Sequence, residues 1–174
     1  NKEIVAFEKV KTELTRDVQL PYFDPDAHTT LQTDASGKGL GACLLQNGKP
    51  IYFASKALTK AERNYSNIER ETLGTIWGME KFHYFLYGKN FTLETDQKPL
   101  EAIYKKHLTD VSPRVLKLLV RSLPYDFECK WRKGTDLKVA DALSRNISIH
   151  GREEMTEKEI KLPIVAVNQV TAES

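Results

Sequence analysis

Acidic residues occupy four positions where the sequence predicts strand ends or helices. Asp34 ends the run TLQTD, Asp96 ends FTLETD, and Glu71 and Asp141 fall within helical segments. In open α/β sheets, sites form beyond the carboxyl ends of neighbouring strands, so Asp34 and Asp96 would meet if their strands pair. Clustered carboxylates repel one another and are stable together only when a cation lies among them. The pattern therefore indicates a site for hard divalent cations.

Such a site has a defined chemistry. Two divalent ions about 3.5 to 4 Å apart can hold the attacking and leaving oxygens of a phosphodiester, and they require three or four acids. Each acid also has an ordinary explanation when it is taken alone. Asp34 could form a turn, Asp96 could end a strand, Glu71 could be a surface charge and Asp141 could open a helix. The spacing alone does not decide between the two interpretations.

Helical geometry brings Glu71 toward the predicted sheet. With Ile68 as the reference and about 100° per residue, Thr75 and Met79 lie near the same axis, whereas Lys81 points away. Glu71 lies about 60° from that axis, at the edge of the buried stripe. We therefore expect its side chain to reach over the sheet toward the two strand-end aspartates.

Strand and helix signals supply the elements that would position these acids. Asn47-Gly48 separates two extended runs and favours a β-hairpin. Residues 60–87 predict one long helix that Gly88 ends. Further expected elements are an amphipathic helix over residues 1–18, strands in TLQTDAS, FTLETD and DFECKWRKG, and helices in PLEAIYKK, residues 113–122 and ADALSRN. Their order predicts an α/β fold with a mixed five-stranded sheet, three antiparallel strands first and two parallel strands after, flanked by helices on both faces.

Length, charge and hydropathy indicate which general class of protein the chain belongs to. The chain has 174 residues and a net charge of +2, so one globular domain is expected and no bulk charge indicates a polyanionic partner. We expect neither a membrane-spanning helix nor a signal peptide, and hence a soluble intracellular protein. Because the chain begins at Asn1, we interpret it as a piece of something longer.

Several segments together resemble one family. TDASGKGLGACLLQ, SNIERETLGTI, NFTLETDQKPL and RKGTDLKVADALSR are similar, in this order, to the ribonuclease H domain of gypsy-type long-terminal-repeat retrotransposon polyproteins. The resemblance covers about residues 30–146. It implies three regions: the end of the reverse transcriptase connection in residues 1–25, a ribonuclease H domain in residues 26–146, and a polar tail toward integrase in residues 147–174.

The resemblance also implies function. It makes Asp34, Glu71, Asp96 and Asp141 a set of metal ligands for two Mg²⁺ ions, with Mn²⁺ as a substitute, and it favours Glu71 over nearby Glu69. The expected activity is hydrolysis of the RNA strand of RNA:DNA hybrids during reverse transcription. Expected partners are the hybrid and the polymerase domain of the same polyprotein, with no membrane. The expected location is a cytoplasmic virus-like particle, or the nucleus.

The chain departs from the family at two places. Gln97 stands where relatives often have histidine, and the segment RKGTDLKVADA lacks the mobile histidine that cellular ribonucleases H have before the last acid. Because such a histidine would help product release, we expect slower turnover or a contribution from Lys133 or Lys138.

Nucleic-acid contacts are expected at three places around the acids. Ser36 and Gly37 follow Asp34 and would let the backbone approach RNA 2′-hydroxyls. Short polar side chains at a helix start could bind a strand of the hybrid, although Ser66 could instead be only an N-cap. Basic clusters could bind phosphates or form a solvated face. The complete expected set is Ser36, Gly37, Ser66, Asn67, Gln97, Lys105, Lys106, Arg114 and Lys117.

Two other functions fit parts of the pattern. A transposase or integrase core uses similar metal chemistry, but its acids come in the order Asp, Asp, Glu, whereas here the glutamate is early and Asp141 is late. A vestigial domain could serve as a scaffold or bind nucleic acid without catalysis. The four intact acids argue against that alternative.

Overall fold

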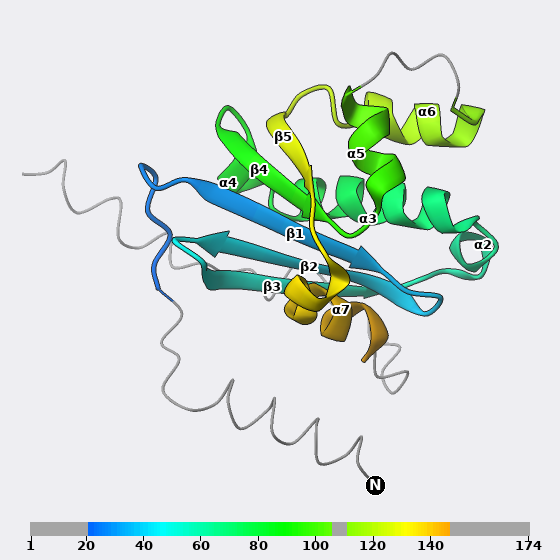
Figure 1. Ribbon diagram of the computed structural model, residues 1–174, viewed down its shortest axis with the longest axis horizontal. Helices are drawn as coiled ribbons and strands as arrows, with labels where there is room; N and C mark the ends of the chain where they lie inside the picture. The colour runs from blue at the N-terminus through cyan, green and yellow to red at the C-terminus, as the bar shows by residue number, and fades with distance from the viewer. Residues whose placement is uncertain (1–20, 106–110, 147–174) are drawn as a thin grey trace, which may run out of the picture.

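A mixed sheet forms the centre of the molecule. The computed structural model describes residues 21–105 and 111–146, and in this part five strands pair in the order β3-β2-β1-β4-β5 (Figure 1). The strands are β1 (Thr29–Ala35), β2 (Gly39–Gln46), β3 (Lys49–Ala57), β4 (Asn90–Thr95) and β5 (Asp126–Trp131). Strands β1 to β3 are antiparallel, whereas β4 runs parallel to β1 and β5 runs parallel to β4. The predicted fold class is therefore confirmed.

The turn between β2 and β3 has the predicted chemistry. Asn47 and Gly48 have φ angles of 52° and 72°, a left-handed conformation that these two residue types adopt most readily. Two-residue turns of this kind match the twist of the flanking strands. The turn lies at the end of β2 that is remote from Asp34, because β2 begins beside Asp34 and ends at Gln46.

The helices form two groups around the sheet. They are α2 (Lys60–Arg63), α3 (Asn67–Lys81), α4 (His83–Leu86), α5 (Lys98–Lys105), α6 (Pro113–Val120) and α7 (Lys138–Arg145), with a 3₁₀ turn, η2 (Gly134–Asp136), before α7. In Figure 1, α3 and α7 lie on opposite sides of the strands, with α5 and α6 on the side of α3. The predicted arrangement of helices on both faces is confirmed.

The single long helix predicted over residues 60–87 is wrong, because the chain forms three helices there. Thr59 caps α2 and Ser66 caps α3, each through a reciprocal capping box with the glutamate three residues later. A capping box satisfies the free N–H groups of a new first turn, and so it begins a helix rather than continuing one. Phe82, with φ −104° and ψ 22°, then separates α3 from α4.

Helix α3 covers one face of the sheet with an apolar stripe. Met79 packs in a cluster with Leu31 of β1 and Leu44 of β2, and Ile76 packs in a second cluster with Leu40. All five side chains are at most 1% exposed. The larger cluster fixes the C-terminal end of α3 on the sheet, and the smaller cluster fixes the middle of α3.

Helix α7 lies close against β2 on the opposite face. A Cβ atom added to Gly41 would stand 2.2 Å from the carbonyl oxygen of Ala140 and 2.7 Å from the amide nitrogen of Ser144. No side chain fits in that space, so glycine allows the backbone of α7 to rest on β2. This close approach brings the end of α7 next to Asp34.

Some predictions fall outside the described residues. The helix predicted over residues 1–18 and the polar tail at 147–174 both lie there, and the boundaries of the three predicted regions stay predictions. Within the described ranges, no helix has the length and apolar character needed to cross a bilayer.

Candidate metal centre

Strand pairing brings the two aspartates together. Strands β1 and β4 are parallel neighbours in which Gln32 is paired with Glu94. Asp34 lies two residues after Gln32, near the end of β1, and Asp96 lies two residues after Glu94, directly after β4. The carboxyl ends of neighbouring parallel strands meet at one edge of the sheet. This register explains why two aspartates separated by 61 intervening residues share a site.

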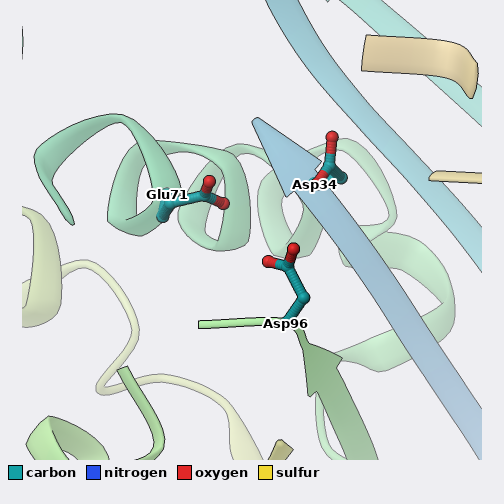
Figure 2. A group of neighbouring side chains, drawn as sticks. All are labelled: Asp34, Glu71 and Asp96. Atoms are coloured by element: carbon teal, nitrogen blue, oxygen red, sulfur yellow. The ribbon is translucent and has the colours of Figure 1, made fainter. Parts of the chain in front are cut away.

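Glu71 completes the cluster from helix α3. One carboxylate oxygen from each of Asp34, Glu71 and Asp96 lies within 4.8 Å of the others. Figure 2 shows Glu71 and Asp96 directed toward the space beside Asp34. The neighbouring Glu69 does not take part, because its carboxylate accepts the Ser66 amide and pairs with Arg114. The structure thus places Glu71, and not Glu69, beside the aspartates.

The cluster is electrostatically strained without a counter-charge. Burial, followed by the charges of Asp34 and Asp96, raises the pKa of Glu71 to about 9. Burial also raises the pKa of Asp34, against a lowering hydrogen bond from Ser144. Three converging carboxylates supply the oxygen ligands that hard divalent cations prefer, and a cation would remove the repulsion. The residues therefore fit a divalent metal ion.

Asp141 stands apart from the other three acids. It is on α7, its side chain is 39% exposed, and Oδ1 accepts a hydrogen bond of 2.5 Å from Nε of Arg145. Its negative charge nevertheless contributes to the raised pKa of Asp34. The structure brings three of the four predicted acids into one group and leaves Asp141 at the rim, paired with a cation.

Three further residues hold the aspartates in place, and none of them was predicted to do so from the sequence. The hydroxyl of Ser144 donates to Oδ2 of Asp34. The indole N–H of Trp131 donates to the carbonyl oxygen of Asp96 over 2.9 Å, and Nε2 of Gln97 donates to its Oδ1 over 3.1 Å. Gln97 was expected to bind nucleic acid. No local pattern identifies Ser144 or Trp131, because both contacts join segments far apart in the sequence.

The residues expected to contact RNA near Asp34 form a turn. The Ser36 hydroxyl accepts the amides of Lys38 and Gly39 and lies 2.6 Å from the carbonyl oxygen of Ser144. Gly37 is exposed, and a Cβ atom there would meet nothing within 4 Å. Open space at Gly37 leaves room for a nucleic-acid backbone, whereas the hydroxyl of Ser36 is engaged within the protein.

At the start of α3, the ordinary interpretation of Ser66 holds. Its side chain accepts the Glu69 amide as the N-cap of the helix. Asn67 follows as the first helical residue, is exposed, and accepts a 3.4 Å hydrogen bond from Arg70. Whether either residue also contacts nucleic acid stays a prediction.

The predicted basic cluster is partly neutralised. One guanidinium nitrogen of Arg114 donates to both carboxylate oxygens of Glu69, at 3.1 and 3.2 Å, and the group stacks on the ring of Tyr65. Lys117 is exposed and lines the same shallow pocket as Arg114. The side chain of Lys105 and all of Lys106 lie outside the described residues.

Comparison with known proteins defines the class of this fold. An RNase H1 named LC11-RNase H1, solved in complex with an RNA/DNA hybrid, superposes with a TM-score of 0.55 at 14% sequence identity. The match covers 66% of this chain and 92% of that structure. At this identity the likeness concerns the fold alone, and it defines an RNase H-like fold.

Sequence comparison then places the chain within that class. Residues 1–93 match the family described as the RNase H-like domain found in reverse transcriptase, and the chain belongs to this family. It is 40% identical over 142 residues to the retrovirus-related Pol polyprotein from transposon 297 of Drosophila melanogaster, and 35% identical over 142 residues to that from transposon gypsy of the same organism. These matches cover 82% and 80% of this chain but only 13% and 14% of the two polyproteins. The resemblance to gypsy-type elements is confirmed.

Proposed function

We propose that this domain hydrolyses the RNA strand of RNA:DNA hybrids during reverse transcription, in a reaction that depends on Mg²⁺. The observation that carries the proposal is the convergence of Asp34, Glu71 and Asp96 at the strand ends of an RNase H-like fold. When bound, divalent cations supply the positive charge that activates the attacking water and stabilises the leaving oxygen of a phosphodiester.

The residues of the chain have separate tasks in this proposal. The cations would be held by Asp34, Glu71 and Asp96. The partly exposed Asp141 would act at the rim, either after Arg145 moves away from its carboxylate or while Arg145 stays paired with it. Gly37 leaves the edge beside Asp34 open, which favours close approach of the substrate backbone. Trp131 and Gln97 keep Asp96 in place through its carbonyl and carboxylate oxygens.

The domain would work as part of a longer polyprotein. The relatives from transposons 297 and gypsy are Pol polyproteins, and the matched region is a small share of each. We therefore propose that a polymerase domain of the same polyprotein is its partner, and that it acts in a cytoplasmic particle or in the nucleus. The net charge of +2 supports this dependence, since affinity for a polyanion grows with the number of phosphates neutralised.

One observation favours a noncatalytic scaffold as a second candidate. The carboxylate of Asp141 is paired with Arg145 and does not join the other three acids. Binding of Mn²⁺ separates the candidates, because a scaffold has no need of a cation at the cluster. Saturable binding that Asp34→Asn removes supports the nuclease.

Substrate choice tests the proposal. With Mg²⁺ present, we expect endonucleolytic cuts in the RNA of a labelled RNA:DNA hybrid, leaving 5′-phosphate and 3′-hydroxyl ends, and no cuts in double-stranded DNA of the same sequence. Gel analysis of end-labelled strands measures both. Equal cleavage of the two duplexes would exclude a ribonuclease H function.

A further inference from the structure

Ser144 stands between helix α7 and the metal centre. Its side chain is fully buried, and its hydroxyl donates to Oδ2 of Asp34 across 110 positions of sequence. The same oxygen lies 2.9 Å from the carbonyl oxygen of Asp141. Ser144 lies about one helical turn after Asp141 on α7, and its hydroxyl contacts Asp34 at the end of β1.

The backbone around Ser144 is held from two sides. The hydroxyl of Ser36, in the turn after β1, lies 2.6 Å from the carbonyl oxygen of Ser144. On the other side, the backbone of Ser144 packs against Gly41 of β2, where an added Cβ atom would lie 2.7 Å from the amide nitrogen of Ser144. The contact with Asp34 is therefore fixed by the docking of the whole helix and does not depend on a free rotamer of one exposed side chain.

We propose that Ser144 is a positioning residue for the metal centre, which fixes the orientation of the Asp34 carboxylate and couples it to the docking of α7. This inference rests on the proposed function, because it assumes that Asp34 binds a cation. A buried carboxylate with one oxygen held by a hydroxyl has less freedom to rotate away from Glu71 and Asp96. Partners that hydrogen-bond a metal ligand typically change metal affinity by about 10- to 100-fold when they are removed.

Direct measurement of Mn²⁺ binding tests the role of Ser144 without an activity assay. Electron paramagnetic resonance of free Mn²⁺ gives the dissociation constant for the wild type, Ser144→Ala and Asp34→Asn. We expect Ser144→Ala to weaken binding by about 10- to 100-fold. The matched control is Ser122→Ala, because Ser122 is also buried and donates its hydroxyl to a backbone carbonyl, that of Leu119, away from the acids. Ser122→Ala should bind Mn²⁺ like the wild type.

A second pair of variants removes the effect of packing. Ser144→Thr and Ser144→Val add nearly the same bulk, but only threonine keeps the hydroxyl. If Ser144→Ala fails to fold, a Thr variant that binds Mn²⁺ at least about tenfold more tightly than the Val variant supports the proposal. Equal dissociation constants for the Thr and Val variants would overturn it.

The outcomes separate this inference from the proposed function. If the wild type binds Mn²⁺, Asp34→Asn abolishes binding and Ser144→Ala binds like the wild type, the positioning role is wrong and the metal site stands. If the wild type and Asp34→Asn bind Mn²⁺ equally, the cluster is not the metal site, and both proposals fail.

Discussion

Glu71 illustrates how its surroundings change the chemistry of one carboxyl group. It is only 4% exposed, and burial together with the charges of Asp34 and Asp96 raises its pKa to about 9. Without a cation, the folded protein therefore holds a proton on Glu71 at neutral pH. A divalent cation would compete with that proton, so metal binding should release it.

Replacement of Glu71 by glutamine should change how stability depends on pH. Between an unfolded pKa near 4.5 and the folded pKa of about 9, the folded state binds one proton more than the unfolded state, so stability falls as pH rises. The loss is at most about 1.4 kcal/mol per pH unit for one proton. Glu71→Gln should remove this contribution, so its stability relative to the wild type rises with pH.

Urea unfolding in EDTA at pH 5, 6, 7 and 8 measures the difference. The matched control is Glu80→Gln on the same helix, because Glu80 is exposed and pairs with Arg121. Parallel stability curves for Glu71→Gln and the wild type across this range would show that Glu71 ionises normally.

At the scale of residues, the sequence predicted the cluster only in part. Asp34 and Asp96 could be predicted because each ends a recognisable strand, and Glu71 because the helical period placed it at the edge of a buried stripe. The position of Asp141 at the rim could not, since it depends on where α7 docks on the sheet. The contact of Ser144 with Asp34 depends on the docking of α7, which no local pattern encodes.

Helix α7 connects the site to the rest of the fold. It is eight residues long, and within it only Ala140 and Ser144 are buried. Its attachment therefore relies on the close approach over Gly41 and on the hydrogen bonds at Ser144. An element of this size has little apolar burial of its own, so backbone fit decides its position.

Gly41→Ala should displace α7. The new Cβ atom would stand 2.2 Å from the backbone oxygen of Ala140, which cannot rotate away. Overpacking of this kind costs about 1–3 kcal/mol of stability. Gly37→Ala is the control for stability, because its Cβ atom would meet nothing within 4 Å, and its effect should stay within about 0.5 kcal/mol. Thermal unfolding compares the two, and an unchanged melting temperature for Gly41→Ala would contradict the described packing.

Within the residues that the structure describes, the prediction of elements failed where capping signals interrupt a helical period. The apolar period over residues 60–87 predicts a helix correctly but is insensitive to breaks. The pairs Thr59 with Glu62 and Ser66 with Glu69 have the spacing of capping boxes, and both begin helices in the structure. The strands and the Asn47-Gly48 turn were predicted well, because alternation and turn chemistry are local properties.

Across the whole molecule, some acids form ion pairs with arginines and others converge at the metal centre. Several arginines are paired with acids, namely Arg114 with Glu69, Arg121 with Glu80, Arg132 with Glu94 and Arg145 with Asp141. The Arg121–Glu80 pair is exposed on both sides, and pairs of this kind stabilise the fold by only about 0–1 kcal/mol. The carboxylates of Glu69 and Glu94 are buried, so each needs the arginine that pairs with it. Asp34, Glu71 and Asp96, in contrast, face one another at one end of the sheet (Figure 2).

Cleavage of hybrid by an aspartate variant tests the central claim most directly. The measurement is the single-turnover rate of RNA cleavage in an RNA:DNA hybrid with Mg²⁺, for the wild type, Asp96→Asn and Asp126→Asn. Asp126 is an exposed aspartate at the start of β5, paired with Asn90 at the opposite end of the sheet. We predict that Asp96→Asn abolishes cleavage while it keeps the fold, and that Asp126→Asn cleaves like the wild type. Cleavage by Asp96→Asn at the wild-type rate would show that the acid cluster is not the active site.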